Sequence, residues 1–77
     1  MVTKLQKLRK EKNMSQSQLV KAAGVGLRPM QAYEQGYRNI DGAKIETLLD
    51  ISVGLNCRIS DIIENEELAK KLKDNGY

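Results

Sequence analysis

Apolar residues recur at helical spacing from the start of the chain. A helix is predicted over about residues 3–12: Leu5 and Leu8, together with Val2 just before it, fall on one side of a helical wheel, whereas lysines occupy the other side. Thr3 stands where it can cap the first turn of this helix. The pattern predicts an amphipathic helix that turns one side toward a core.

A second helix is predicted at residues 16–23. Leu19 and Ala23 lie four residues apart and so share one side of it. Ser15 is a favourable N-cap residue, and Gly24 is a typical end. We expect a short helix of about two turns.

A third helix is predicted at residues 27–35, only three residues after the second, and it ends at Gly36. Met30 and Tyr33 fall together on its buried side. The opposite side exposes Leu27, Arg28, Gln31, Ala32 and Gln35. Two helices of this length joined by so short a turn form a helix-turn-helix, whose second helix can enter a DNA major groove.

The exposed residues of the third helix suit the reading of base edges. Arg28 can bind guanine, Gln31 can bind adenine, and Ala32 or Leu27 can contact a thymine methyl group. The alternative is that they are ordinary solvated positions, but the helix-turn-helix context favours base reading. Pro29 is tolerated because the first N–H groups of a helix lack intrahelical partners. It disfavours helical geometry at the preceding residue, so a helix that begins one residue later is an alternative.

The second half of the chain predicts further helices after a polar loop at residues 37–43. One helix covers about residues 44–53 and is closed by Gly54. Its expected apolar side consists of Ile45, Leu48, Leu49 and Ser52. Ser60 is expected to cap a fifth helix, whose Ile62 and Ile63 reach the core.

The last residues alternate acids and bases around two leucines, Leu68 and Leu72. These leucines either pack back on the core or contact a second copy of the chain, and the sequence leaves both possibilities open. We therefore divide the chain into a helical domain at residues 1–63 and a C-terminal helical tail at residues 64–77, a possible dimer contact.

Composition excludes most catalytic chemistry. The 77 residues are enough for one small domain with an aliphatic core, since there are three Tyr and no Phe or Trp. No His is available as a general base or metal ligand, and the single Cys57 permits no internal disulfide. Cys57 is expected to be a buried or half-buried apolar residue. We therefore expect no enzymatic activity, no cofactor, no metal site and no small-molecule ligand.

Charge is divided unevenly along the chain. Residues 1–44 carry nine Lys/Arg and three Asp/Glu, whereas residues 45–77 carry four and seven, so the net charges are +6 and −3. The basic half contains the helix-turn-helix, as expected for a face that binds a polyanion. Neither a signal peptide nor a membrane span is recognisable, so we expect a cytoplasmic protein with no membrane partner.

One charged residue interrupts the apolar side of the first helix. Arg9 lies between Val2 and Leu5 in angle, and an unpaired buried charge is costly. The basic half offers few carboxylates, and Glu34 flanks the buried side of the third helix. We predict an Arg9–Glu34 ion pair between the two helices; the alternative is that Arg9 extends to solvent.

Three segments together resemble the Cro-repressor-like (Xre-family) helix-turn-helix proteins: LRKEKNMSQSQLVKAAGV, MQAYEQGYRN and IETLLDISVGLNCRISDII. They span residues 4 to about 63. The resemblance implies an all-α, five-helix repressor-like fold, here with a short C-terminal helical extension. It also implies an arginine late in the first helix paired with a glutamate late in the third, which correspond to Arg9 and Glu34.

The resemblance further implies roles for individual residues. Base reading would fall to Leu27, Arg28, Gln31 and Ala32. Contacts to the DNA backbone would come from Gln16, at the start of the second helix, and from Tyr37, Arg38 and Asn39 in the loop. Gly26 and Leu27 depart from the family, which usually has Ser or Thr and a polar residue there, so Leu27 reads either a methyl group or nothing.

Two functions of different classes follow. The first is a sequence-specific double-stranded DNA-binding regulator, a repressor that acts as a homodimer on an inverted-repeat operator. The second is a protein-interaction module, with a toxin or polymerase subunit as partner and DNA binding secondary. DNA affinity that collapses with added salt distinguishes the first from the second.

Overall fold

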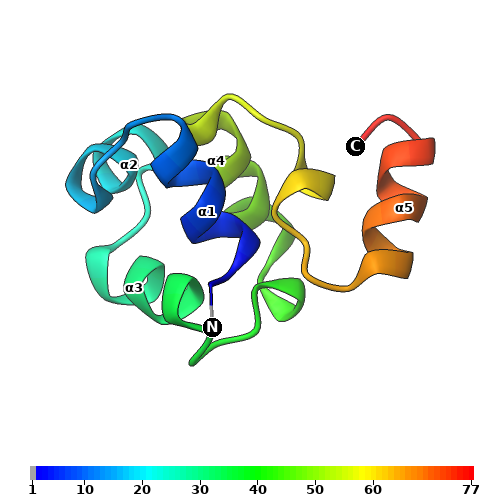
Figure 1. The fold of residues 1–77 in the computed structure, drawn as a ribbon, viewed down its shortest axis with the longest axis horizontal. Coiled ribbons are helices and arrows are strands. Elements are labelled where there is room, and N and C mark those ends of the chain that lie inside the picture. The colour runs from blue at the N-terminus through cyan, green and yellow to red at the C-terminus, as the bar shows by residue number, and fades with distance from the viewer. Residues whose placement is uncertain (1) are drawn as a thin grey trace.

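The computed structural model describes residues 2–77, and this part of the chain is helical throughout, without a β-strand (Figure 1). Five α-helices and two short 3₁₀ turns follow one another within residues 2–77. They are α1 (Lys4–Glu11), α2 (Gln16–Ala23), α3 (Leu27–Gln35), η1 (Ile40–Gly42), α4 (Ile45–Leu55), η2 (Ile59–Asp61) and α5 (Glu66–Asp74). None of the helices within residues 2–77 has the length and apolar character needed to cross a membrane.

The first three helices begin and end where local sequence signals place them. The Thr3 hydroxyl accepts from the Gln6 N–H at 3.2 Å, and Ser15 forms a reciprocal capping box with Gln18. Gly24 and Gly36 end α2 and α3 in the left-handed conformation. Pro29 does not delay α3, because the Met30 N–H already bonds to the carbonyl of the residue before the helix.

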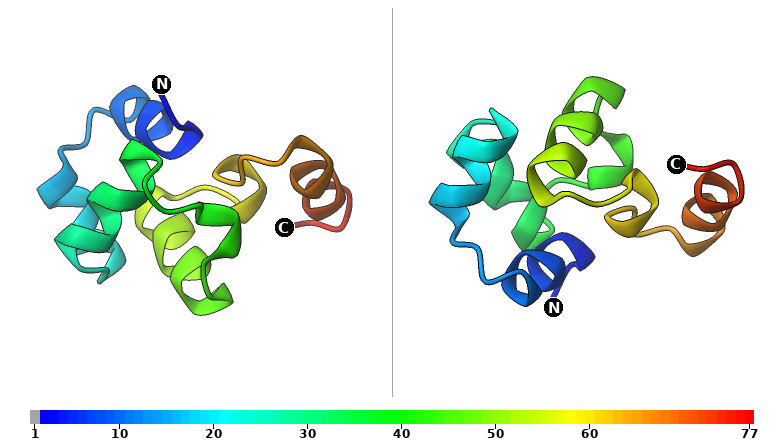
Figure 2. Two further views of the ribbon diagram at one scale, coloured as in Figure 1. Left: turned by 90° about the horizontal axis from the view of Figure 1, so that it is seen from below. Right: turned by 90° about the horizontal axis from the view of Figure 1, so that it is seen from above.

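The core lies between α1, α2, α3 and α4 and continues to residues of η1, η2 and α5, and Tyr33 is the aromatic member of this cluster. In Figures 1 and 2, α1 to α4 form the body of the molecule, and α5 lies to one side of it. The most deeply buried apolar side chains are Leu5, Leu19, Met30, Ile51, Leu55, Ile62 and Ile63. Val2, expected on the apolar side of α1, is exposed.

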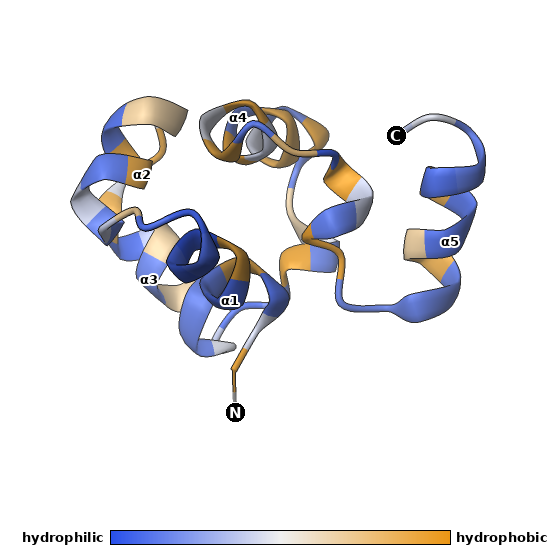
Figure 3. Cartoon of the chain, turned by 45° about the horizontal axis from the view of Figure 1, so that its top comes forward, coloured by the Kyte–Doolittle hydropathy of each residue, from blue (hydrophilic) through white to orange (hydrophobic). Residues whose placement is uncertain are grey.

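Helix α4 differs from the sequence prediction in both its end and its buried side. The helix continues through Gly54 to Leu55, and Asn56 is its C-cap. Gly54 lies inside the helix because α4 packs closely on α2 there: a Cβ at this position would stand 2.9 Å from the Ala23 Cβ. Apolar residues occur on more than one side of α4 (Figure 3), and the buried side consists of Leu48, Ile51, Ser52 and Leu55. Ile45 and Leu49, predicted to be buried, face solvent.

The predicted helix capped by Ser60 is wrong. Residues 59–61 form the 3₁₀ turn η2, and Ser60 is its buried middle residue. The turn begins earlier because the Asp61 carboxylate accepts from the Arg58 N–H at 2.9 Å. Ile62 and Ile63 nevertheless reach the core, as predicted.

Helix α5 is capped by Asn65 and packs mainly against η2. Its Ala69 is buried in the core cluster, and Leu72 packs against that cluster from a half-buried position. The Ser60 N–H donates to the carbonyl of Tyr77 at 3.0 Å, which ties the end of the chain to η2. Leu72 thus packs on the core of its own chain, whereas Leu68 remains 39% exposed.

Hydrogen bonds to acidic side chains connect the segment before α5, at residues 64–65, to the rest of the molecule. The two Asp41 carboxylate oxygens accept from the N–H groups of Glu64 and Asn65 at 2.8 and 2.9 Å. Glu64 in turn accepts from the Lys4 N–H at 2.6 Å, at the start of α1. These contacts are polar and exposed, so they orient the segment more than they stabilise the core.

Candidate nucleic-acid interface

Helix α3 is held by its neighbours on one side and is open on the other. Its buried side carries Met30, Tyr33 and Glu34, and it contacts both α1 and α2. The predicted base-reading residues lie on the remaining surface: Leu27 and Arg28 are exposed, and Gln31 and Ala32 are half-buried. In Figure 1, α3 lies at the edge of the molecule, so a partner can approach this surface.

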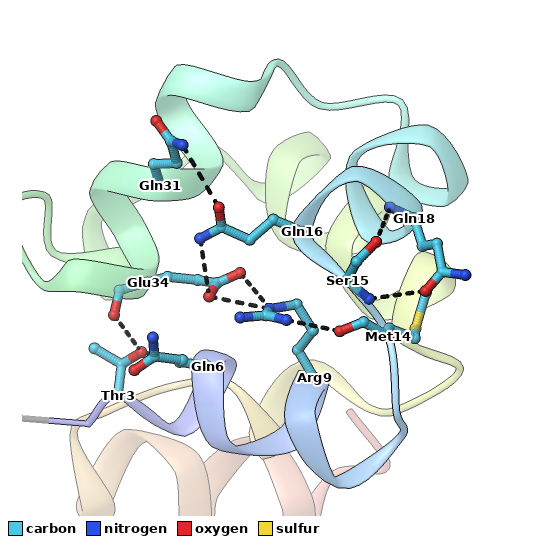
Figure 4. A network of polar contacts seen from close by, with 9 residues as sticks. All are labelled: Thr3, Gln6, Arg9, Met14, Ser15, Gln16, Gln18, Gln31 and Glu34. Atoms are coloured by element: carbon cyan, nitrogen blue, oxygen red, sulfur yellow. Dashed lines mark hydrogen bonds and ion pairs between the residues drawn. The ribbon is translucent and has the colours of Figure 1, made fainter.

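Arg9 and Glu34 connect α1 to α3 beneath that surface (Figure 4). The Arg9 Nε donates to both Glu34 carboxylate oxygens, at 3.1 and 2.9 Å, and Nη1 donates to the Met14 carbonyl at 2.6 Å. Both residues are buried, and Glu34 is 0% exposed. Glu34 is therefore the partner that the burial of Arg9 required. The Thr3 hydroxyl adds a bond to the Glu34 carbonyl at 2.9 Å.

Gln16 and Gln31 continue this polar network toward the surface (Figure 4). The Gln16 Nε2 donates to Glu34 Oε1 at 3.3 Å, and the Gln31 Nε2 donates to Gln16 Oε1 at 3.5 Å. A residue expected to touch a phosphate and a residue expected to read a base are thus brought into contact. Sequence reasoning assigned both residues to the interface but did not predict that they meet.

A shallow hollow at the surface brings two arginines together. Arg28, Pro29 and Ala32 of α3 line it with Arg38 from the loop that follows α3. The hollow therefore combines a predicted base reader with the predicted charged contact to the DNA backbone. Two guanidinium groups at one exposed place form an attractive surface for a polyanion.

A neighbouring groove extends this basic surface to the start of α4. Arg38 borders it as well, and Lys44 stands on the α4 side. Sequence reasoning missed Lys44; the available signal was a basic residue at the very start of the helix predicted over residues 44–53. The groove is lined by Val25, Pro29, Tyr33, Arg38, Asn39, Gly42, Ala43, Lys44 and Thr47.

The two helices that begin beside this groove have no side-chain cap. Gly26, which has no side chain, precedes α3, and Lys44, whose ammonium group can only donate, precedes α4. The side chains of Thr3, Ser15 and Asn65, in contrast, cap α1, α2 and α5. The first N–H groups of α3 and α4 are thus left for an external acceptor such as a phosphate oxygen.

The loop residues differ in what they can offer. Tyr37 and Arg38 are exposed, and their side chains enter none of the hydrogen bonds within residues 2–77. The Asn39 side chain accepts from the Asp41 N–H at 3.0 Å and so caps η1. The side-chain carbonyl oxygen of Asn39 is thus already bonded within the loop, and its side-chain amide nitrogen is the group that can contact DNA.

Cys57 lies elsewhere, in a hollow with Arg58, Asp61 and Lys73. Burial, and to a smaller extent the nearby Asp61 carboxylate, raise the pKa of its thiol from 9.0 to about 11, while Lys12 acts in the opposite direction. A thiol with so high a pKa is a poor nucleophile and a poor metal ligand. It has no part in the surface around α3.

The family model described as Cro/C1-type HTH DNA-binding domain matches residues 4–67, which include α1 to α4, η2 and the first residues of α5. No curated protein and no solved structure matches the chain.

Proposed function

The chain belongs to the family of Cro/C1-type helix-turn-helix DNA-binding domains, which makes it a DNA-binding transcription regulator, and we propose that it represses transcription as a homodimer on an inverted-repeat operator. The observation that carries this proposal is the open surface of α3, where Arg28 and Gln31 stand beside Ala32 and Leu27. An arginine, a glutamine and small or apolar neighbours are the groups that distinguish base pairs in the major groove. The resemblance to repressors supports the direction of regulation.

Contacts to phosphates hold α3 in place in this proposal. Gln16 lies at the N-terminus of α2, and Arg38 and Lys44 border the groove beside α3. Tyr37 and the amide nitrogen of Asn39 lie in the same loop. Such contacts supply most of the affinity and make it depend on salt, whereas the α3 surface selects the sequence.

The homodimer is supported by a second apolar stripe on α4. Ile45, Leu49 and Val53 are 63%, 49% and 73% exposed, and their spacing of four residues places them on one side of the helix. Under a two-fold axis through Leu49, the stripe faces its own copy, with Ile45 of one chain opposite Val53 of the other. Three side chains are far fewer than the roughly 20–30 residues per side of a stable interface, so we expect pairing mainly on DNA.

The first experiment is selection of binding sites from a random pool of duplex DNA at near-physiological salt. We expect enrichment of an inverted repeat whose half-site centres lie about 34–36 Å apart. A reporter promoter carrying that site should lose transcription when the protein is present. If no motif is enriched and retention vanishes as salt rises, only nonspecific phosphate attraction remains, and the protein-interaction function replaces this one.

Two single substitutions separate base reading from phosphate contact on the selected site. Arg28→Ala should relax the preference at one base pair and cost about 1–3 kcal/mol there. Arg38→Ala is its matched control, since both arginines line one hollow. It should weaken binding to all sequences alike and lower the salt slope by about one unit. Equal weakening of every sequence by Arg28→Ala would show that Arg28 contacts phosphate alone.

A further inference from the structure

The Glu34 carboxylate can only accept hydrogen bonds, and this property determines how the side-chain amides of Gln16 and Gln31 are oriented. Glu34 is completely buried and receives two bonds from the Arg9 guanidinium. Gln16 must therefore turn its NH₂ group, not its carbonyl, toward Glu34 Oε1, at 3.3 Å. The charge of the ion pair thus decides which end of the Gln16 amide points inward.

The orientation of the Gln16 amide in turn determines the orientation of the Gln31 amide. With its NH₂ group turned inward, Gln16 presents its carbonyl oxygen to α3, and the Gln31 NH₂ group donates to that oxygen at 3.5 Å. Figure 4 shows the Gln31 carbonyl pointing away from Gln16. Gln31 is left with a carbonyl oxygen and a second N–H, one acceptor and one donor in a defined order.

That order matters because an adenine presents one acceptor, N7, and one donor, N6–H, in the major groove, whereas a guanine presents two acceptors. A glutamine amide whose orientation is already chosen loses less freedom on binding adenine. We propose that Glu34, acting through Gln16, fixes the amide orientation of Gln31 and so makes Gln31 selective for adenine at one position of the operator. The proposal rests on the proposed function, in which α3 reads bases.

In this scheme Glu34 and Gln16 are positioning residues, and Gln31 is the reader. Gln16 retains one N–H beyond the bond to Glu34, and this group can donate to a phosphate at the N-terminus of α2. The Gln16 side chain then links the position of the DNA backbone on the protein to the orientation of the Gln31 amide. The competing role for Gln16 is a phosphate contact alone, without influence on base choice.

The binding test compares Gln16→Ala, Gln31→Ala and the double variant on the selected site and on versions with guanine at each adenine. We expect Gln31→Ala to remove an adenine preference of about tenfold at one position, and Gln16→Ala to reduce that same preference to about twofold. The double variant should show no further loss of preference. Arg38→Ala is the control, since it lowers affinity but should leave the preference intact.

The result that would overturn the inference is uniform weakening by Gln16→Ala with the adenine preference retained. A Gln31→Ala variant with unchanged preference at all positions would overturn it as well. If the unmodified protein selects no sequence, the proposed function fails, and the inference fails with it.

An NMR measurement on the free protein tests the relay without DNA. Gln16→Ala should shift the side-chain amide resonances of Gln31, because it removes the acceptor at the Gln31 NH₂ group. Ser17→Ala is the matched control: Ser17 is the exposed neighbour on α2 and should leave those resonances in place. Identical Gln31 resonances in the two variants would overturn the inference even when the protein binds DNA, so this failure is distinct from failure of the proposed function.

Discussion

At the scale of single residues, the buried Arg9 has a large energetic consequence. Its guanidinium is satisfied by both oxygens of Glu34 and by the Met14 carbonyl. A buried ion pair adds little net stability compared with apolar residues of the same shape, but removal of one partner leaves a charge without compensation. The pair therefore specifies how α1 and α3 meet more than it stabilises them.

Glu34→Ala should lower the free energy of unfolding by about 3–5 kcal/mol, because Arg9 then stays buried and unpaired. The double variant Arg9→Met/Glu34→Leu should lose clearly less, since both charges are gone. Urea denaturation followed by circular dichroism measures all variants. A double variant that loses as much stability as Glu34→Ala, or more, would contradict this account.

Cys57 gives a second prediction at this scale. The folded pKa of about 11 exceeds the ordinary value of 9.0, so at pH 8 the thiolate is about 100-fold less abundant than in the unfolded chain. We expect iodoacetamide to alkylate the folded protein far more slowly than the urea-unfolded protein. Because the thiol is favoured by folding, its contribution to stability is present below pH 9 and is lost as the pH rises through about 11. Equal alkylation rates would contradict the burial of this thiol.

At the scale of elements, α4 has more apolar surface than one buried side can use. Leu48, Ile51 and Leu55 face the core, and the close approach to α2 at Gly54 settles the rotation of the helix about its axis. The stripe at Ile45, Leu49 and Val53 is consequently left outside. A helix that is apolar on nearly all sides normally finds partners on all sides.

Gly54→Ala tests that close approach. In an exposed helix interior this change stabilises by roughly 0.5–1 kcal/mol, but here the new Cβ would stand 2.9 Å from the backbone nitrogen of Ala23 as well as from its Cβ. We expect destabilisation of about 1–3 kcal/mol, as for overpacked cores. Gly42→Ala is the control, because a Cβ there meets no atom within 4 Å. Increased thermal stability of Gly54→Ala would show that α2 and α4 separate easily.

At the scale of the whole molecule, basic residues of the first half gather on one surface around α3. Arg28, Arg38 and Lys44 gather at α3 and the neighbouring groove. Two acids of the first half are used internally, Glu34 by Arg9 and Asp41 by the segment before α5. The charge that faces a partner near α3 is therefore positive.

Pairing on DNA is the prediction that belongs to this scale. Leu49→Glu places charges at the centre of the proposed two-fold contact and should leave one chain, not two, on the selected inverted repeat. Sedimentation of the protein with fluorescent DNA measures the stoichiometry. Leu68→Glu is the matched control, since Leu68 is a comparably exposed leucine on α5. Loss of pairing in Leu68→Glu alone would assign the dimer contact to the C-terminal helix.

The bounds of α1, α2 and α3 could be predicted from the sequence because they depend on neighbours within four residues. Thr3 and Ser15 cap the backbone that follows them, and Gly24 and Gly36 supply the left-handed residue that ends a helix. The contact between Arg9 and Glu34 could be anticipated as well, since few carboxylates were available to a guanidinium on an apolar side.

Only the tertiary structure decided which stripe of α4 is buried, why Gly54 continues a helix, and that η2 replaces a helix capped by Ser60. It also placed Lys44 beside Arg38 and Gln16 against Gln31. These features depend on side chains that are distant in sequence and meet only when the helices pack. A helical wheel assigns an angle to each residue of one helix, but the rotation of that helix against its neighbours follows from close packing, which no single segment contains.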